Sequence, residues 1–155
     1  WGFISEWSKD PFDPNRVRPF NARAETVKEK NLFKGSWRHK RCLLPASSFF
    51  EKGHHIRRKD SKPFWMAGIW NSWMSSEGSE LETCCILTTK PNELVKPLHN
   101  RMPVIIPNGL EHEWLESCKD SYELEKLELL LIGWDSNDWV AEPLVKQPIS
   151  QMSLF

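Results

Sequence analysis

Two segments rich in β-branched and aromatic residues, 62–73 and 82–89, constrain the fold of this chain more than any other feature. Such residues favour strands because their side chains fit a pleated, half-buried surface. Both segments are longer than the five or six residues of an ordinary strand. We therefore expect these two strands to form the centre of a sheet around which the rest of the chain is arranged.

Four shorter strands are predicted around this centre, two of them on either side of Pro45. In chain order they cover residues 41–44, 48–51, 102–106 and 139–145. The polar stretch 53–62 predicts a loop between two strands. Near the N-terminus, three prolines within residues 1–20 prevent a continuous helix or a central strand, so an irregular segment is expected there.

Helices are predicted in three places. Residues 25–34 favour a helix that Gly35 interrupts. A second helix is expected after Asn108, which can cap it, with apolar residues at helical spacing: Leu110, Trp114, Leu115 and Cys118. A third is expected to end at Gly133, with its buried side at Leu124, Leu127, Leu130 and Leu131. This mixed order of strands and helices favours an α+β domain with mainly antiparallel strands.

The length and composition fit one globular domain spanning residues 1–155. The chain has a mass of 18.2 kDa, with 39% hydrophobic and 27% charged residues, which argues against a disordered or rod-like chain. Its apolar runs are far too short to cross a bilayer. The four cysteines form no CxxC pair, so neither a disulfide scaffold nor a zinc ribbon is expected. We expect an intracellular protein, in the cytoplasm or nucleoid, or in the nucleus of a eukaryotic source.

The net charge of zero conceals an uneven distribution. Residues 1–62 hold 15 basic and 7 acidic side chains, whereas residues 63–155 hold 6 and 14. One interpretation is a solvated acidic surface on the C-terminal helices. The other is that the basic half provides a track for phosphate groups. The sequence leaves both open.

Three segments combine polar groups with predicted strand ends: 21–26, 41–51 and 99–106. Taken singly, each has a structural explanation. Glu51 can alternate outward from a strand, and His99 can bind a loop carbonyl. Clustered polar groups mark functional sites only in a probabilistic way.

Taken together and in order, these segments resemble the SRAP family, the SOS response-associated peptidases. Residues 21–26 are similar to its NARAET motif, residues 41–51 to its RCLxPxxGFYEW motif, and residues 99–106 to its HxRMPVIL motif. The opening WGFI with Trp7, residues 63–70 and residues 86–89 match further segments of that family in the same order. The similarity therefore extends through most of the chain.

The resemblance implies a fold and an activity. The fold would be a single α+β domain with a mainly antiparallel, barrel-like sheet and flanking helices. The activity would be recognition of abasic sites in single-stranded DNA, followed by a crosslink through a cysteine that becomes N-terminal when Met is removed. It would protect abasic sites during replication or the SOS response, and a peptidase activity would expose the cysteine. No cofactor or metal is implied, and a monomer is expected.

The resemblance also implies roles for individual residues. The catalytic residues would be Glu51 as general acid and base, His99 in proton transfer at the sugar and in reversal, and Asn21 in orienting the reactive terminus. Arg23 and Arg101 would bind the phosphates that flank the lesion. Further DNA contacts would come from stacking aromatic residues, for which Trp37 and Trp70 are the foremost candidates, with Trp65 and Trp73 as others.

The sequence departs from the family pattern at three points. Lys52 stands where the family has Trp, and Ser48 stands where it has Gly. The family also begins with Met-Cys-Gly-Arg well before its WG segment, so we expect an N-terminal segment with the nucleophilic cysteine to be absent from this chain. Cys42 has its nitrogen in a peptide bond and is interpreted as a core residue.

Two alternatives to a crosslinking enzyme are open. The first is a non-catalytic module that binds single-stranded DNA through the same surface. The second is a metal hydrolase that uses His54, His55, His99 and His112, but these histidines lack HExxH or comparable spacing. The first alternative is the stronger of the two.

Overall fold

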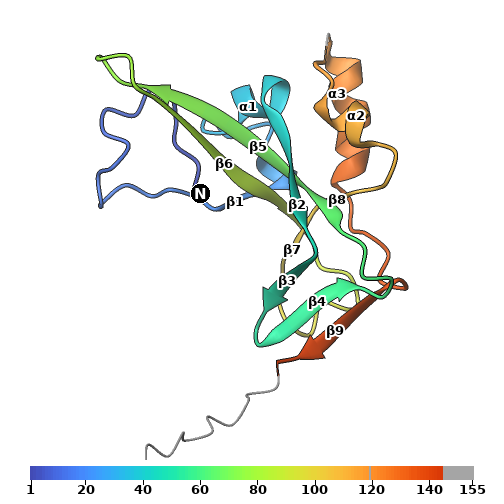
Figure 1. Cartoon of the computed structure of the whole chain (residues 1–155). Helices are drawn as coiled ribbons and strands as arrows, with labels where there is room; N and C mark the ends of the chain where they lie inside the picture. The colour runs from blue at the N-terminus through green and yellow to red at the C-terminus, as the bar shows by residue number, and fades with distance from the viewer. Residues whose placement is uncertain (119, 145–155) are drawn as a thin grey trace, which may run out of the picture.

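The computed structural model describes residues 1–118 and 120–144. In it two sheets meet where β2 ends and β5 begins (Figure 1). The larger sheet has the order β1-β6-β5-β2, with β7 paired to β6 and β8 paired to β5. Its strands are β1 Asn21–Arg23, β2 Arg41–Ala46, β5 Phe64–Met74, β6 Glu80–Thr89, β7 Met102–Pro103 and β8 Ile105–Ile106. The smaller sheet has the order β3-β4-β9, comprising Ser48–Glu51, His54–Arg58 and Trp139–Pro143.

The two long predicted strands are confirmed as β5 and β6, which form an antiparallel hairpin at the centre of the larger sheet. Gly68 of β5 is closely packed against β2. A Cβ there would lie 2.3 Å from Leu44 Cδ1, 2.9 Å from Cys42 Sγ and 3.1 Å from the Cys85 carbonyl oxygen, so a larger residue would displace side chains of β2.

The α+β class and the mainly antiparallel pairing are confirmed, with β1–β6 as a parallel pair. The barrel-like closure is not confirmed. Among the described residues the larger sheet ends at β1 on one side and β2 on the other, and no pairing joins these two strands.

The prediction of a loop over residues 53–62 is wrong, because residues 54–58 form β4 between β3 and β9. Lys52 and Gly53 have φ values of 43° and 74° and make a tight hairpin turn into this strand. Ile56 is fully buried, while Arg57 pairs with Glu142 of β9 at 2.7 Å. A single buried residue among polar neighbours gave too weak an alternation to indicate a strand. For β9, the predicted end at Val145 lies outside the described residues.

The predicted helix over residues 25–34 is also wrong. Residues 24–26 form a short 3-10 segment, η1, and the helix α1 spans Lys34–His39, with Gly35 inside it. Phe33 and Trp37 are buried on one side, and this anchorage outweighs the poor helical propensity of glycine.

Two further helices, α2 Glu111–Leu115 and α3 Ser121–Glu128, occupy the predicted places, and η2 Leu129–Leu131 continues α3. Asn108 does not cap α2, because the chain turns through Gly109 (φ 92°) and Leu110 takes the cap position. At α3 the cap is Asp120, whose carboxylate accepts a hydrogen bond of 2.9 Å from the Glu123 backbone N–H. No helix in the described part of the chain is long and apolar enough to cross a membrane.

Apolar side chains form two cores, one beside the helices and one between the sheets. In the first, Trp37 and Trp114 are buried with their ring centroids 5.8 Å apart, against the face of the larger sheet. In the second, Phe64 and Trp139 meet edge to face at 4.7 Å. The second core brings the two sheets into contact and so fixes the geometry of the junction between them.

Candidate functional site

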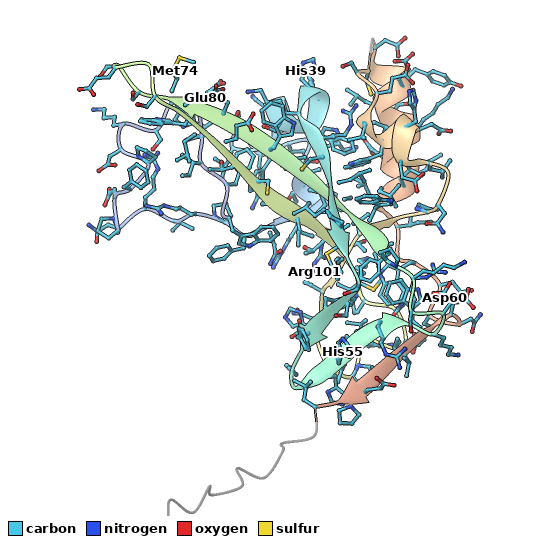
Figure 2. The ribbon with its side chains drawn as sticks, in the orientation of Figure 1. His39, His55, Asp60, Met74, Glu80 and Arg101 are labelled. Atoms are coloured by element: carbon cyan, nitrogen blue, oxygen red, sulfur yellow. The ribbon has the colours of Figure 1, made fainter. Side chains whose placement is uncertain are left out.

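A cavity of about 350 Å³ lies at this junction and brings together the three polar segments singled out in the sequence. Asn21 and Arg23 come from β1, Glu51 from the end of β3, and His99 and Arg101 from the segment before β7. Figure 2 shows Arg101 near the place where the two sheets meet. The remaining lining residues are Phe49, Phe50, Met66, Ile86, Thr88, Met102 and Pro103.

The strand β3 directs Glu51 into the cavity. Side chains two residues apart in a strand lie on the same face, and Phe49 packs against Phe64 in the core between the sheets. Glu51 therefore faces the same side and is half-buried, with 27% of its side chain exposed. The outward orientation considered from the sequence does not apply to Glu51.

Glu51 and His99 are the two ionisable side chains lining the cavity that lie in contact with each other. His99 Nδ1 lies 3.5 Å from Glu51 Oε2 and 3.1 Å from the carbonyl oxygen of Arg101. Because a carbonyl oxygen can only accept a hydrogen bond, that second contact requires a proton on Nδ1. The other ring nitrogen, Nε2, is then the atom of neutral His99 that can accept a proton.

The two arginines of the cavity differ in their partners. Arg101 donates two hydrogen bonds of 2.7 Å to the carboxylate of Glu25 and a further one to the carbonyl of Thr88. The guanidinium of Arg101 lowers the pKa of Glu25 below its usual value. Arg23 is exposed and has no ion pair among the described residues. Of the two predicted phosphate ligands, Arg23 thus has an uncompensated charge, whereas that of Arg101 is neutralised.

The predicted tryptophans lie elsewhere. Trp37 is 2% exposed, so its prediction as a stacking residue is wrong: a ring enclosed by the core cannot contact a base. Trp70 is half-buried on β5, with the Lys40 ammonium 5.4 Å from its ring, and lines a different cavity with Trp1 and Cys84. That cavity shares no lining residue with the one at the junction.

Phe50 is an aromatic residue of the cavity that the sequence analysis did not single out. It is 64% exposed and stacks on His55 of β4, with ring centroids 5.0 Å apart and an angle of 18° between the planes. The signal was the alternation within β3: once Phe49 is assigned to the core, Phe50 must lie on the opposite face.

None of the four cysteines lines the cavity, and three of them are held in the protonated form. Burial raises the pKa of Cys42 to about 12, and it also raises the pKa of Cys84 and that of Cys85. A thiol must ionise to act as a nucleophile, so these three are held in the unreactive form. Among residues 1–118 and 120–144, no group of three or more His, Cys, Asp or Glu side chains could hold a metal ion.

Comparison with known proteins relates this geometry to one family. Residues 1–148 match the family model described as SOS response associated peptidase (SRAP). The chain is 39% identical over 150 residues to the abasic site processing protein YoqW of Bacillus subtilis, covering 91% of this chain and 65% of that protein. It is 29% identical over 141 residues to the abasic site processing protein YMR114C of Saccharomyces cerevisiae, covering 84% and 38%.

A solved structure shows the same fold. The crystal structure of a protein from Bacteroides thetaiotaomicron superposes with a TM-score of 0.80 at 33% identity, covering 91% of this chain and 66% of that one. The chain thus spans about two thirds of the length of YoqW and of the Bacteroides protein, and 38% of the length of YMR114C.

Proposed function

This chain belongs to the SOS response associated peptidase family, and we propose that the cavity at the junction of its sheets processes abasic sites in DNA. The observation that carries the proposal is the 3.5 Å approach of Glu51 to His99, in the cavity that Asn21 also lines. The uncompensated Arg23 at the same cavity supplies a positive charge for a phosphate. The names of the relatives, as abasic site processing proteins, support the same substrate.

The reaction that fits these groups is capture of the abasic aldehyde by a 1,2-aminothiol. The amine nitrogen attacks C1′ of the ring-opened sugar, and water leaves to give an imine. The thiol sulfur then adds to the imine carbon while the thiol proton passes to nitrogen, closing a thiazolidine. The cysteines of this chain have their nitrogens in peptide bonds. We therefore assign the aminothiol to a chain-terminal cysteine of the intact protein.

The cavity residues have distinct roles in this reaction. Glu51 gives a proton to the departing hydroxyl, regains one from the nitrogen as the imine forms, and then passes the thiol proton to that nitrogen as the ring closes. His99 acts on the sugar through Nε2: it takes the proton of the C1′ hydroxyl during ring opening and delivers it to O4′ as the C1′–O4′ bond breaks, and the same transfers run backward in reversal. The amide of Asn21 orients the amine, and Arg23 holds a phosphate beside the lesion.

The test is covalent capture by the full-length gene product with its mature N-terminus. Incubation with an abasic single-stranded oligonucleotide is expected to give a heat-stable protein–DNA band. Glu51→Gln should slow its appearance about 100-fold, the lower end of general acid–base effects. The matched control is Glu77→Gln, an exposed carboxylate of the β5–β6 turn. Equal rates for the parent and Glu51→Gln would overturn the proposal.

A second candidate, a non-catalytic module for single-stranded DNA, is favoured by one observation: the lining of the cavity includes Arg23, which has no ion pair among the described residues, and Phe50, whose side chain is exposed. Covalent capture separates the two functions, because a module of this kind binds the oligonucleotide but gives no heat-stable band.

For the peptidase activity, we propose that the same Glu51–His99 pair removes any leader preceding the cysteine. Mass spectrometry should find that leader retained in Glu51→Gln.

A further inference from the structure

A third cavity, of about 460 Å³, lies between α1 and the loop of residues 4–8 and has no role in the reaction above. It shares no lining residue with the cavity at the junction of the sheets. In Figure 2, His39 of α1 lies well apart from Arg101 of the junction. Whatever this cavity binds is therefore held at a distance from the reacting sugar.

The lining of this cavity is strongly basic. Lys34, Arg38 and Lys40 lie in it together with His39, against a single acidic residue, Glu6. None of the three cations forms an ion pair among the described residues, in contrast to Lys28, Arg57, Arg58 and Arg101 elsewhere in the chain. The Lys40 ammonium is oriented by Asn71, which accepts a hydrogen bond of 2.9 Å, but this partner is neutral and leaves the charge uncompensated.

An aromatic ring is displayed in the same cavity. Trp7 is 57% exposed, although the loop that carries it is fixed on both sides. Before it, the Ile4 carbonyl accepts a hydrogen bond of 3.0 Å from the buried Asn71 amide. After it, the Ser8 carbonyl accepts one of 2.6 Å from the Trp73 indole. The exposure of Trp7 is thus built into the scaffold, and no loop motion is needed to present the ring.

Uncompensated cations beside a rigid exposed indole are the two components of a site for single-stranded nucleic acid: phosphates bind the cations, and a base stacks on the ring. We propose that this cavity binds single-stranded DNA at nucleotides remote from the lesion. The inference deepens the proposed function, on which it rests for the identity of the nucleic acid. Its consequence is that a long strand occupies both cavities, whereas a short one occupies only the cavity at the junction.

The experiment compares the affinities of the full-length protein for undamaged single strands of about 6 and about 20 nucleotides. The parent is expected to bind the longer strand about tenfold more tightly or better. Lys34→Glu with Arg38→Glu should abolish this gain and reduce the salt slope by about 1.4, since each phosphate contact on a single strand contributes about 0.7. Lys62→Glu with Lys59→Glu, the same charge change on the β4–β5 turn, should preserve the gain.

The proposed stacking of a base on Trp7 is tested separately. Trp7→Ala should weaken binding of the longer strand about tenfold, while Trp7→Phe should restore most of it, because stacking tolerates any flat ring. The control is Phe12→Ala, an exposed aromatic of the same N-terminal region outside the cavity. An inorganic polyphosphate should compete weakly, because it has no bases to stack.

Two results would overturn the inference. One is a length-dependent gain that survives the charge reversals. The other is an unchanged affinity in Trp7→Ala with equal binding of polyphosphate, which would make the cavity a non-specific anion patch. Failure of the proposed function gives a different outcome: no covalent band with abasic DNA, with the length-dependent gain and its loss on charge reversal still present.

Discussion

Arg41 and Glu51 begin and end one sequence motif, yet they lie in regions of opposite character. Arg41, at 6% exposure, lies beside the helices, and its guanidinium donates to the backbone carbonyls of Trp37, Arg38, Trp114 and Glu116. Glu51 lies in the cavity between the sheets, where its carboxylate is 3.5 Å from His99 Nδ1. One polar group is enclosed and bonded to backbone; the other faces space that a ligand can fill.

This difference separates a residue that stabilises the fold, Arg41, from one that is available for the reaction, Glu51. The Arg41 side chain ties α1 and α2 to the start of β2, and loss of its donors would leave carbonyls buried without partners. The carboxylate of Glu51 fixes no such element and keeps lone pairs available. The contrast between Arg101 and Arg23 repeats the pattern inside the site, because Glu25 immobilises the first and leaves the second to a ligand.

The largest effect expected from this comparison is on stability. Arg41→Met should lower the free energy of unfolding by about 3 kcal/mol or more, since four carbonyls lose a charged donor. Chemical denaturation measures it, with Lys62→Met as an exposed control expected to change stability by about 0.5 kcal/mol or less. A loss for Arg41→Met no greater than that of the control would remove the distinction between the two regions.

Glu51→Gln should slow the reaction while leaving the stability of the fold nearly unchanged. The rate of covalent capture falls about 100-fold, equivalent to about 2.7 kcal/mol in the barrier. The free energy of unfolding should change by about 0.5 kcal/mol or less, because the residue supports no backbone group. A loss of stability matching that of Arg41→Met would assign Glu51 to the scaffold instead.

A smaller effect concerns Glu25 and depends on pH. Because the pKa of Glu25 is lowered in the folded protein from a usual value of 4.5, its ion pair stabilises the fold above that pH. The stabilisation disappears as the pH falls from 4.5 through the lowered pKa. With Glu25 partly exposed, Glu25→Gln should cost only about 0.5 to 1 kcal/mol near neutral pH and nothing at strongly acid pH. Thermal unfolding across this range measures it, and a cost independent of pH would contradict the assignment.

The smallest effect is expected at the cysteines. Cys84→Ser should leave the rate of covalent capture within about twofold, because Cys84 lies outside the site and its raised pKa keeps the thiol protonated. The comparison is with the full-length protein in which the proposed chain-terminal cysteine is replaced by serine, where capture should vanish. Loss of capture in Cys84→Ser would move the nucleophile into this chain.

The sequence predicted the main parts of this arrangement because their signals are local. The β5–β6 hairpin follows from two aromatic and β-branched segments, whereas the convergence of Asn21, Glu51 and His99 was implied only by the resemblance of the ordered motifs to one family. What could not be predicted depends on tertiary contacts. Nothing local shows that Trp37 is enclosed by Trp114.

Which arginine forms an ion pair also depends on contacts between residues far apart in the sequence. Arg23 and Arg101 are alike in sequence, and only the approach of Glu25, 76 positions from Arg101, separates a free cation from a neutralised one. The strand β4 was missed for the same reason, since its two neighbours, β3 and β9, supply the pairing that its own polar sequence does not indicate.

The most direct test of the central claim is the structure of the full-length protein bound to a single strand containing an unreactive abasic analogue. The account predicts the sugar in the cavity between the sheets, with its oxygens within about 3 Å of Glu51 and His99, the reach of a hydrogen bond. Its neighbouring phosphate should lie on Arg23. A sugar bound outside this cavity, away from Glu51 and His99, would contradict the account.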